Sequence, residues 1–257
     1  MAVSKSPPEP QSDAIRIVPL RMPAVLRAEA QAAPTARLTY RNGPLLPAVE
    51  VFTIFWGSAW KKSPLSATVA DINRFFDAIL VSVLIDQLSE YNAGTLKISH
   101  GRRTGSVTIT TPAPARSLTD TAIRAFLQQR ISGGKVPKVT KNSLYFIYVP
   151  PGVRVAMGGS ASCQAFCGYH NAIGRRTFYA VMPYPDCSGC TGSLAAFDAL
   201  TSTSSHELCE AITDPVPGEG WYDDANGEVG DICAWETKTV GQYTVQLEWS
   251  NKSNRCE

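Results

Sequence analysis

The sequence has no excess of charge, no long hydrophobic run and no cysteine before position 160. Lysine and arginine number 24 against 22 aspartates and glutamates, and the basic residues are scattered apart from two Arg-Arg pairs. Nucleic-acid binding requires concentrated positive charge, which is missing here. A membrane-spanning helix needs about 20 apolar residues, and even the segment 75–88 is interrupted by Asp77 and Asp86. We therefore expect a soluble protein with no membrane span and no nucleic-acid partner.

The seven cysteines all lie in the last hundred residues or so, and six of them form groups by spacing. The groups are Cys163 with Cys167, Cys187 with Cys190, and Cys233 with Cys256, and Cys209 is left over. Close cysteine pairs can hold zinc, but such a site usually needs four converging thiolates. Disulfides are therefore favoured, with one between Cys233 and Cys256 and a buried free thiol at Cys209. Disulfides imply a secreted protein in an oxidising compartment, although Met1 is not followed by the pattern of a secretory signal.

Composition changes along the chain and suggests one domain with a leader. Residues 1–37 are rich in Pro, Ala and Arg and carry no sustained periodicity, which predicts a disordered leader or pro-segment. Residues 38–257 form the expected single domain, because 257 residues with 44% hydrophobic content can bury a sizeable core. No internal repeat is visible.

Hydrophobic periodicity predicts a mixed α+β fold. Strands are expected at 49–56, 144–149 and 177–182, a hairpin from 96–99 and 106–110, and helices at 66–91, 120–131 and 194–212. The order is that of a zincin-like domain, in which a single mixed sheet is backed by helices and one helix carries the metal ligands. The cysteines place disulfides in a loop-rich C-terminal part.

The last predicted helix contains the motif His206-Glu207-Leu208-Cys209-Glu210. Residues four apart project from the same face of a helix, so His206 and Glu210 can hold one ion while Glu207 lies beside them. In zincins with two histidines in this motif, the first Glu acts as general base on metal-bound water. Here a carboxylate replaces the second histidine, which suits zinc but also harder ions such as calcium.

Several acidic residues follow the motif and provide candidates for a third metal ligand. Asp214 lies on roughly the same helix face, and Glu228 and Asp231 lie in a Gly-bounded segment. The simpler interpretation is that the His-Glu-Glu group belongs to a solvated helix face. The surrounding helix residues are small and uncharged, however, so the group is not part of a generally charged face, and this favours a metal site.

His170 is the other histidine with a candidate role. It follows Cys167-Gly168-Tyr169, so one interpretation is a histidine hydrogen-bonded beside a disulfide. The alternative is a metal ligand or a catalytic electrophile at the same site.

The chain resembles the Exordium, or phosphate-induced, protein family over about residues 38–256. The matching blocks, in order, are Tyr40 to Leu46, Ser117 to Asp120, Cys163 to His170, Cys187 with Cys190, Ser205 to Glu210, Trp221-Tyr222, Asp231 to Cys233 and Gln246 to Cys256. The resemblance implies an extracellular or cell-wall protein. It places His170, His206, Glu207, Glu210, Glu228 and Asp231 on motif positions. The chain departs from the family pattern at Asp214 and in having Cys209.

Two functions therefore compete. In the first, the protein is a zinc-dependent hydrolase, most simply a peptidase, with Glu207 and His170 as catalytic residues and a peptide or cell-wall polymer as substrate. In the second, it is a non-catalytic extracellular binding module whose zinc or calcium ion ties the helix to the C-terminal loops. A purely structural interpretation, in which the acidic cluster caps helices and binds no ion, stands beside both.

Overall fold

A computed structural model describes residues 17–20 and 36–257. The predicted leader, residues 1–37, therefore lies mostly outside the described residues. Within it, Val18–Pro19 form the short strand β1, which pairs antiparallel with Phe166–Ile173 (β9).

The centre of the molecule is a six-stranded mixed sheet in the order β1-β9-β10-β6-β3-β4. Its remaining strands are β3 (Glu50–Trp56), β4 (Arg102–Ile109), β6 (Ser143–Val149) and β10 (Thr177–Pro183). These four run parallel to one another, whereas β9 and β1 are antiparallel to their neighbours. Every residue of β6 is buried, as expected for a strand whose two faces are both covered.

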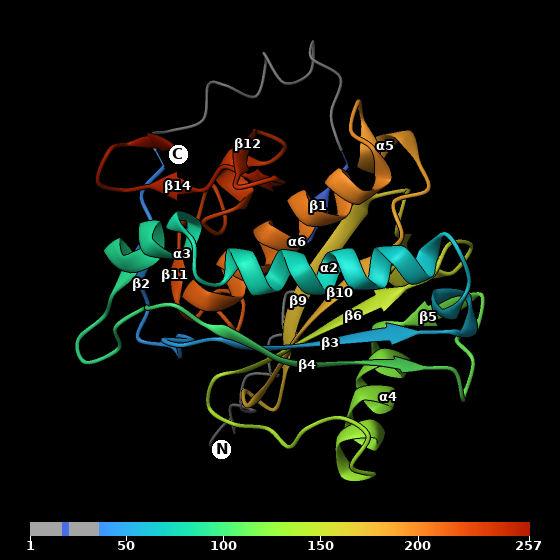
Figure 1. Ribbon diagram of the computed structural model, residues 1–257. Coiled ribbons are helices and arrows are strands. Elements are labelled where there is room, and N and C mark those ends of the chain that lie inside the picture. Colours follow the sequence, from blue (N-terminus) through green and yellow to red (C-terminus); the bar gives the residue numbers. More distant parts are fainter. Residues whose placement is uncertain (1–16, 21–35) are drawn as a thin grey trace, which may run out of the picture.

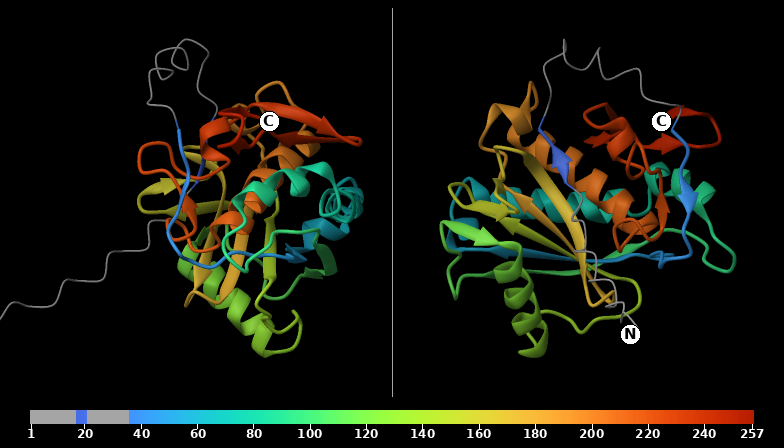
Figure 2. Two further views of the ribbon diagram at one scale, coloured as in Figure 1. Left: turned by 90° about the vertical axis from the view of Figure 1, so that its left-hand side faces the viewer. Right: turned by 180° about the vertical axis from the view of Figure 1, so that it is seen from behind.

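Helices cover both faces of this sheet (Figure 1, Figure 2). Helices α2 (Leu65–Ile79) and α6 (Ala196–Thr213) lie on one face, and α4 (Asp120–Ser132) lies on the other. Alternate residues of β6 enter two separate hydrophobic clusters, with Phe146 on the α2 side and Ile147 on the α4 side. The structure confirms the predicted α+β class, a mixed sheet backed by helices, and places the motif-bearing helix directly against that sheet.

Short elements complete the chain. They are β2 (Thr39–Tyr40), η1 (Ser58–Lys61), α3 (Val83–Gln87), η2 (Leu88–Tyr91), β5 (Ser117–Thr119), β7 (Arg154–Met157), β8 (Ser160–Ala161), α5 (Ser188–Thr191), β11 (Trp221–Tyr222), η3 (Asp231–Cys233), β12 (Thr237–Val240), β13 (Tyr243–Gln246), β14 (Trp249–Ser250) and β15 (Arg255–Cys256). Several of them cluster after α6, so the loop-rich C-terminal part is as predicted.

The single helix predicted over 66–91 is wrong, because the chain turns after α2. Ile79 ends α2, and α3 begins at Val83 after Ser82, whose side chain accepts a hydrogen bond from the amide of Leu84. A serine in this position starts a new helix. The spacing of apolar residues continues through the break, and hydrophobic periodicity alone therefore did not reveal it.

The hairpin predicted between 96–99 and 106–110 is also wrong. The second arm belongs to β4, which pairs with β3 in parallel. The first arm bonds elsewhere, since the amide of Ser99 donates to Pro47, that of Ile98 to the Asn92 side chain and that of Leu96 to Ala93. These partners occupy backbone groups that a hairpin would have paired with the second arm.

All seven cysteines lie among the described residues, and six form disulfides. The bonds are Cys163–Cys187, Cys167–Cys190 and Cys233–Cys256, and Cys209 is free and buried. The last pair and the free thiol are confirmed, but grouping the first four cysteines by sequence proximity was wrong. Two parallel bridges instead join the start of β9 to the segment around α5. Three disulfides indicate an oxidising, extracellular environment.

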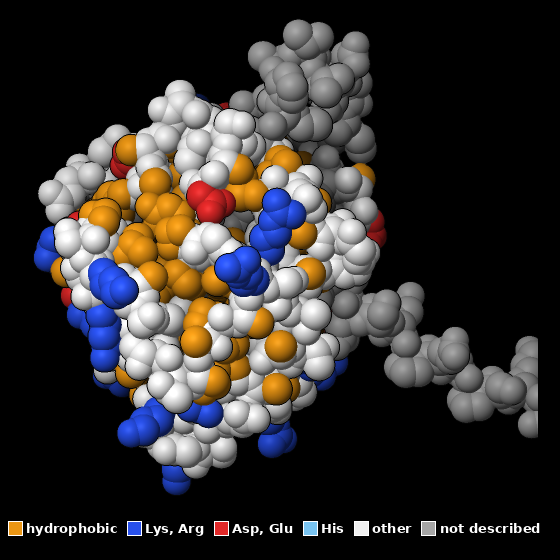
Figure 3. All heavy atoms as spheres, turned by 90° about the vertical axis from the view of Figure 1, so that its right-hand side faces the viewer, with side chains coloured by type: hydrophobic (Ala, Val, Ile, Leu, Met, Phe, Trp, Pro, Cys, Tyr) orange, Lys and Arg blue, Asp and Glu red, His pale blue; other side chains and the backbone are white. Residues whose placement is uncertain are grey.

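Within the part of the chain that the structure describes, no helix has the length and apolar character to cross a bilayer. Figure 3 views the end of the molecule toward which the parallel strands point, and hydrophobic side chains gather there among scattered Lys and Arg residues.

Candidate metal centre

All of α6 after its first turn is buried. Residues from Ala199 to Thr213 are all buried, because the helix packs between the sheet and β13. The small Ser, Thr and Ala side chains of its first half allow this close packing. His206 is 0% exposed, and Glu207 and Glu210 are each 1% exposed. The interpretation of this group as a solvated helix face is therefore wrong.

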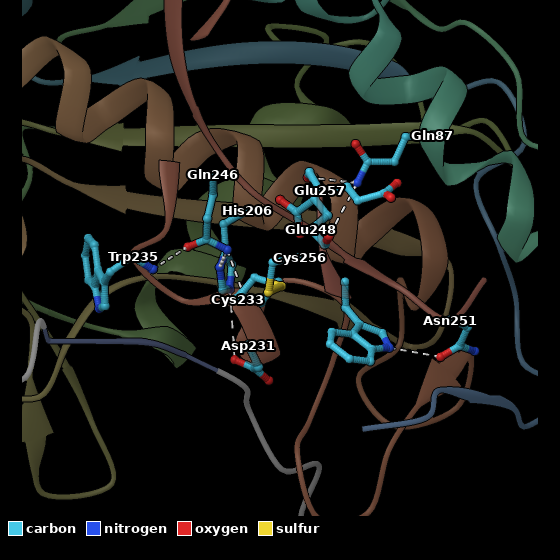
Figure 4. Close-up of a disulfide and its surroundings, with 12 residues drawn as sticks. Gln87, His206, Asp231, Cys233, Trp235, Gln246, Glu248, Asn251, Cys256 and Glu257 are labelled. Carbon is cyan, nitrogen blue, oxygen red and sulfur yellow. Dashed lines mark hydrogen bonds and ion pairs between the residues drawn. A yellow bond between two sulfur atoms is a disulfide. The ribbon is translucent and has the colours of Figure 1, made fainter. Parts of the chain in front are cut away.

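His206, Glu210 and Asp231 form one group of metal-ligating atoms, which all lie within 4.8 Å of one another. The His206 Nε2 atom lies 2.9 Å from Glu210 Oε1 and 4.0 Å from Asp231 Oδ1. Asp231 joins the group because its backbone amide donates to Glu210 Oε1 and its Oδ2 accepts from the amide of Glu228. Figure 4 shows Asp231 and His206 facing each other beside the Cys233–Cys256 disulfide. One imidazole and two carboxylates are a donor set that fits zinc.

Gln246 contacts the other ring nitrogen of His206, and its amide orientation is fixed by the backbone (Figure 4). Its Oε1 accepts from the amide of Trp235 at 3.2 Å, and its Nε2 donates to the Gly230 carbonyl at 2.9 Å. The same Nε2 lies 2.8 Å from His206 Nδ1. An N–H group therefore points at Nδ1, which must accept it, and the neutral ring carries its own proton on Nε2.

His170 lies on β9 and forms a second group with Glu210 and Glu228, again within 4.8 Å. Its Nδ1 lies 3.1 Å from Glu207 Oε2 and 3.4 Å from Glu210 Oε2. Its Nε2 lies 3.1 Å from the Asp214 carbonyl oxygen and 3.5 Å from Glu228 Oε1. Glu210 thus directs one oxygen to each histidine. The structure brings His170 to the motif-bearing helix, where both of its ring nitrogens have hydrogen-bond partners.

Asp214 serves the backbone. Its carboxylate accepts from the amides of Gly218, Glu219 and Gly220 at 2.6 to 3.1 Å. These bonds satisfy both of its oxygens and close the turn after α6. Of the predicted metal ligands, Asp214 is therefore the one whose carboxylate already has a full set of partners, in agreement with a capping role.

Two glycines let the chain approach the ligands closely. A Cβ atom on Gly230 would lie 2.8 Å from His206 Nδ1 and 3.0 Å from Glu210 Oε1. A Cβ atom on Gly168 would lie 3.1 Å from Glu207 Oε1 and 2.8 Å from the Thr203 methyl group. Side chains at these two positions would push the loop and β9 away from α6.

Burial and charge shift the pKa of the buried groups in opposite directions. Burial would lower the pKa of His170, but Glu228, Glu207 and Glu210 outweigh it and hold that pKa well above its usual value. Burial also raises the pKa of Glu228 well above its usual value and that of Glu207 above its usual range. These protons offset the accumulated negative charge, and a bound cation would displace them.

The ligands around His206 titrate differently. Burial opposes ionisation of Glu210, but His206 and His170 lower its pKa to about 2. Burial raises the pKa of Asp231 to about 7. Burial would lower the pKa of His206, but its acidic neighbours, Glu210 first, outweigh burial and raise that pKa well above its usual value. The N–H group of Gln246 at Nδ1 opposes a second proton on that ring, and we take this contact to keep the ring neutral.

Some buried polar atoms of this centre have no hydrogen-bond partner in the described part of the chain. Both carboxylate oxygens of Glu228 and the Glu207 Oε1 atom have no hydrogen-bond partner among the described residues, although all are buried. Buried carboxylates without partners are strongly unfavourable unless a proton or cation compensates them. Their presence here points to a ligand at the centre.

Gln246 and Glu248 were not identified from the sequence. Both are buried, and Gln246 is the hydrogen-bond partner of His206. The alternating pattern of 243–249 predicts a strand but does not tell which face lies against α6. Cys209, by contrast, is placed as expected, since burial first and Glu248 second raise the pKa of its thiol and keep it unreactive.

A scan against models of protein families and a search of curated proteins find no match to this chain.

Proposed function

We propose that this protein is a secreted metal-dependent hydrolase, with zinc held by His206, Glu210 and Asp231. The observation that carries the proposal is the convergence of these three side chains from α6 and η3 within 4.8 Å. Zinc in catalytic sites is typically held by three protein ligands. The side chain of Asp231 is 19% exposed whereas that of His206 is 0% exposed, so solvent and substrate would reach the ion from the Asp231 side.

Glu207 would act as the general base. It is the neighbour of His206 on α6, its Oε2 contacts His170 Nδ1 at 3.1 Å, and its Oε1 has no partner among the described residues. Burial raises the pKa of Glu207 above its usual value, and a raised pKa suits a carboxylate that takes up and returns a proton. When bound, the ion would lower the pKa of a water molecule.

The proposed substrate is a peptide or a cell-wall polymer. The disulfides support an extracellular location, and the resemblance to the Exordium family implies the same compartment.

The alternative is an ion with a purely structural role, with zinc or calcium tying α6 to the C-terminal segment. The specific observation in its favour is burial, because His206, Glu210 and Glu207 are each at most 1% exposed. In this case the protein would be a binding module and Glu207 would only balance charge.

The experiment that separates these functions compares Glu207→Gln with His206→Ala in the full chain, purified without a His tag. Metal content, melting temperature and cleavage of denatured-protein and glycan substrates are measured. A hydrolase predicts that Glu207→Gln keeps its metal and fold but loses about 10²- to 10⁴-fold in rate, whereas His206→Ala loses the ion assigned to His206, Glu210 and Asp231. Equal metal loss in both variants would make Glu207 a ligand. A wild-type protein that binds metal but cleaves none of the substrates would favour the structural ion.

A further inference from the structure

We infer that the centre binds two divalent cations, and that the second lies at His170, Glu210 and Glu228, with Glu210 bridging the pair. The bridging role of Glu210 rests on the proposed function, because the first ion is the zinc ion that His206, Glu210 and Asp231 would hold. The second group stands on its own contacts. Its ligand atoms come from β9, α6 and the segment before η3, and they lie within 4.8 Å of one another.

The His170 ring is prepared to bind an ion. The carbonyl oxygen of Asp214 lies 3.1 Å from Nε2 and accepts its proton. The lone pair of a neutral ring then sits on Nδ1, which faces Glu207 Oε2 at 3.1 Å and Glu210 Oε2 at 3.4 Å. A lone pair that faces two carboxylates is repelled unless a cation or proton lies between them. Metal-binding histidines characteristically donate their other N–H group to a backbone carbonyl or a carboxylate.

Glu228 is the independent observation that points to a ligand. Its side chain is 0% exposed, and neither oxygen has a hydrogen-bond partner among the described residues. Its only close charged contact of opposite sign in that part of the chain is His170 Nε2, at 3.5 Å. Asp214, which is close by and equally buried, instead receives three backbone amides. The fold thus satisfies one of these two carboxylates with backbone amides and leaves the other, beside the His170 ring, without a hydrogen-bond partner among the described residues.

Glu210 connects the two groups. Its Oε1 lies 2.9 Å from His206 Nε2, and its Oε2 lies 3.4 Å from His170 Nδ1. A carboxylate with one oxygen in each group is the usual bridge of two-metal hydrolytic sites, whose ions lie about 3.5 to 4 Å apart.

Charge also favours two ions. Five buried or nearly buried carboxyl groups surround the two rings, namely Glu207, Glu210, Asp214, Glu228 and Asp231. One divalent cation would neutralise two of them, and two cations would neutralise four. Each group offers one imidazole with carboxylate oxygens, a donor set that suits zinc or manganese.

The test is metal stoichiometry in the full chain, stripped with chelator and reloaded by dialysis against zinc. We expect two zinc ions per chain in the wild type, one in His170→Ala, one in Glu228→Gln, one in His206→Ala, and none in Glu210→Gln. His100→Ala is the matched control and should keep two zinc ions. His100 is 47% exposed and pairs with Asp86, and neither residue belongs to a ligand group. Glu228→Gln is nearly isosteric, and circular dichroism and melting identify any variant that fails to fold.

Reloading with manganese provides a second readout. Two Mn²⁺ ions bridged by one carboxylate give an exchange-coupled paramagnetic resonance spectrum, which should become that of isolated Mn²⁺ in both His170→Ala and His206→Ala. One zinc ion per chain, lost in His206→Ala but kept in His170→Ala, would overturn the second ion and leave the proposed function intact. If the wild type binds one zinc ion per chain and that ion is lost only in His170→Ala, or in both His170→Ala and His206→Ala, the result would overturn the pair of ions. It would also overturn the assignment of the first ion to His206, Glu210 and Asp231. No bound zinc in the wild type would overturn both proposals.

Discussion

The two histidines of the centre differ in what the protein offers to their second ring nitrogen. His170 faces a carbonyl oxygen, which accepts a proton and leaves the other nitrogen available for an ion. His206 faces the N–H group of Gln246, which requires an acceptor and leaves the proton on the nitrogen nearest Glu210. Binding an ion at His206 therefore requires the amide of Gln246 to turn against two backbone partners. The recognisable motif contains the less prepared ligand, and the more prepared one comes from a strand outside it.

The largest effect is expected where the two groups meet. Glu210→Gln removes the shared carboxylate and should abolish binding of both ions. If each ion is present at about 100 times its dissociation constant, loss of one site lowers the free energy of unfolding by about 2.7 kcal/mol. Chemical denaturation with and without zinc measures the difference. If Glu210→Gln still binds one ion with wild-type affinity, the two ligand groups are independent and Glu210 is not shared between them.

The pH dependence should separate the groups next. Each ion displaces protons, so affinity falls as pH falls. In His170→Ala only the His206 group remains, and Asp231, with a pKa of about 7, must be deprotonated. Affinity should rise up to about pH 7 and then level off. In His206→Ala the pKa values of His170 and Glu228 lie well above their usual values, so affinity should continue to rise above pH 7, by about tenfold or more per pH unit.

Calorimetry in buffers of different ionisation enthalpy counts the protons released in each variant. Equal proton release at pH 8 from both variants would show that the two histidines do not differ in protonation.

A smaller effect is expected from Gln246→Glu. A carboxylate at this position would accept the Nδ1 proton of His206 and prepare Nε2 for an ion. Hydrogen bonds to the outer ring nitrogen of a metal-binding histidine change metal affinity by about 10- to 100-fold, so zinc should bind at least tenfold more tightly in a His170→Ala background. Competition with a chromophoric chelator measures it, and Gln242→Glu, on the loop before β13, is the control. Weaker zinc binding would mean that the bonds of Gln246 to Gly230 and Trp235 matter more than the tautomer.

The smallest effect concerns Glu248, which is buried like Glu228 but lies outside both ligand groups. Burial raises its pKa well above the usual value. The folded state then binds the proton more tightly than the unfolded state, so stability falls as pH rises above about 4.5. Glu248→Gln removes this penalty and should raise the free energy of unfolding at pH 7 by about 1 to 2 kcal/mol. Glu228→Gln should instead lower it when zinc is present. Stabilisation of similar size in both variants, measured in zinc, would argue that Glu228 binds no ion.

The amino-acid sequence determined those features that depend on neighbours along the chain. Periodicity located α4, α6 and the buried strands β3, β6 and β10, because these patterns repeat within one element. Helical geometry brought His206 and Glu210 onto one face, since residues four apart are adjacent on any α-helix.

Features that depend on partners far away in the sequence were decided by the tertiary structure. Cys163 pairs with Cys187 rather than Cys167 because β9 runs beside α5, and sequence proximity carries no information about that contact. The placement of His170 against Glu210 likewise requires β9 to lie under α6. Whether an imidazole meets an N–H group or a carbonyl depends on the orientation of one buried amide and one peptide unit. That orientation is set by backbone hydrogen bonds that only the assembled fold provides.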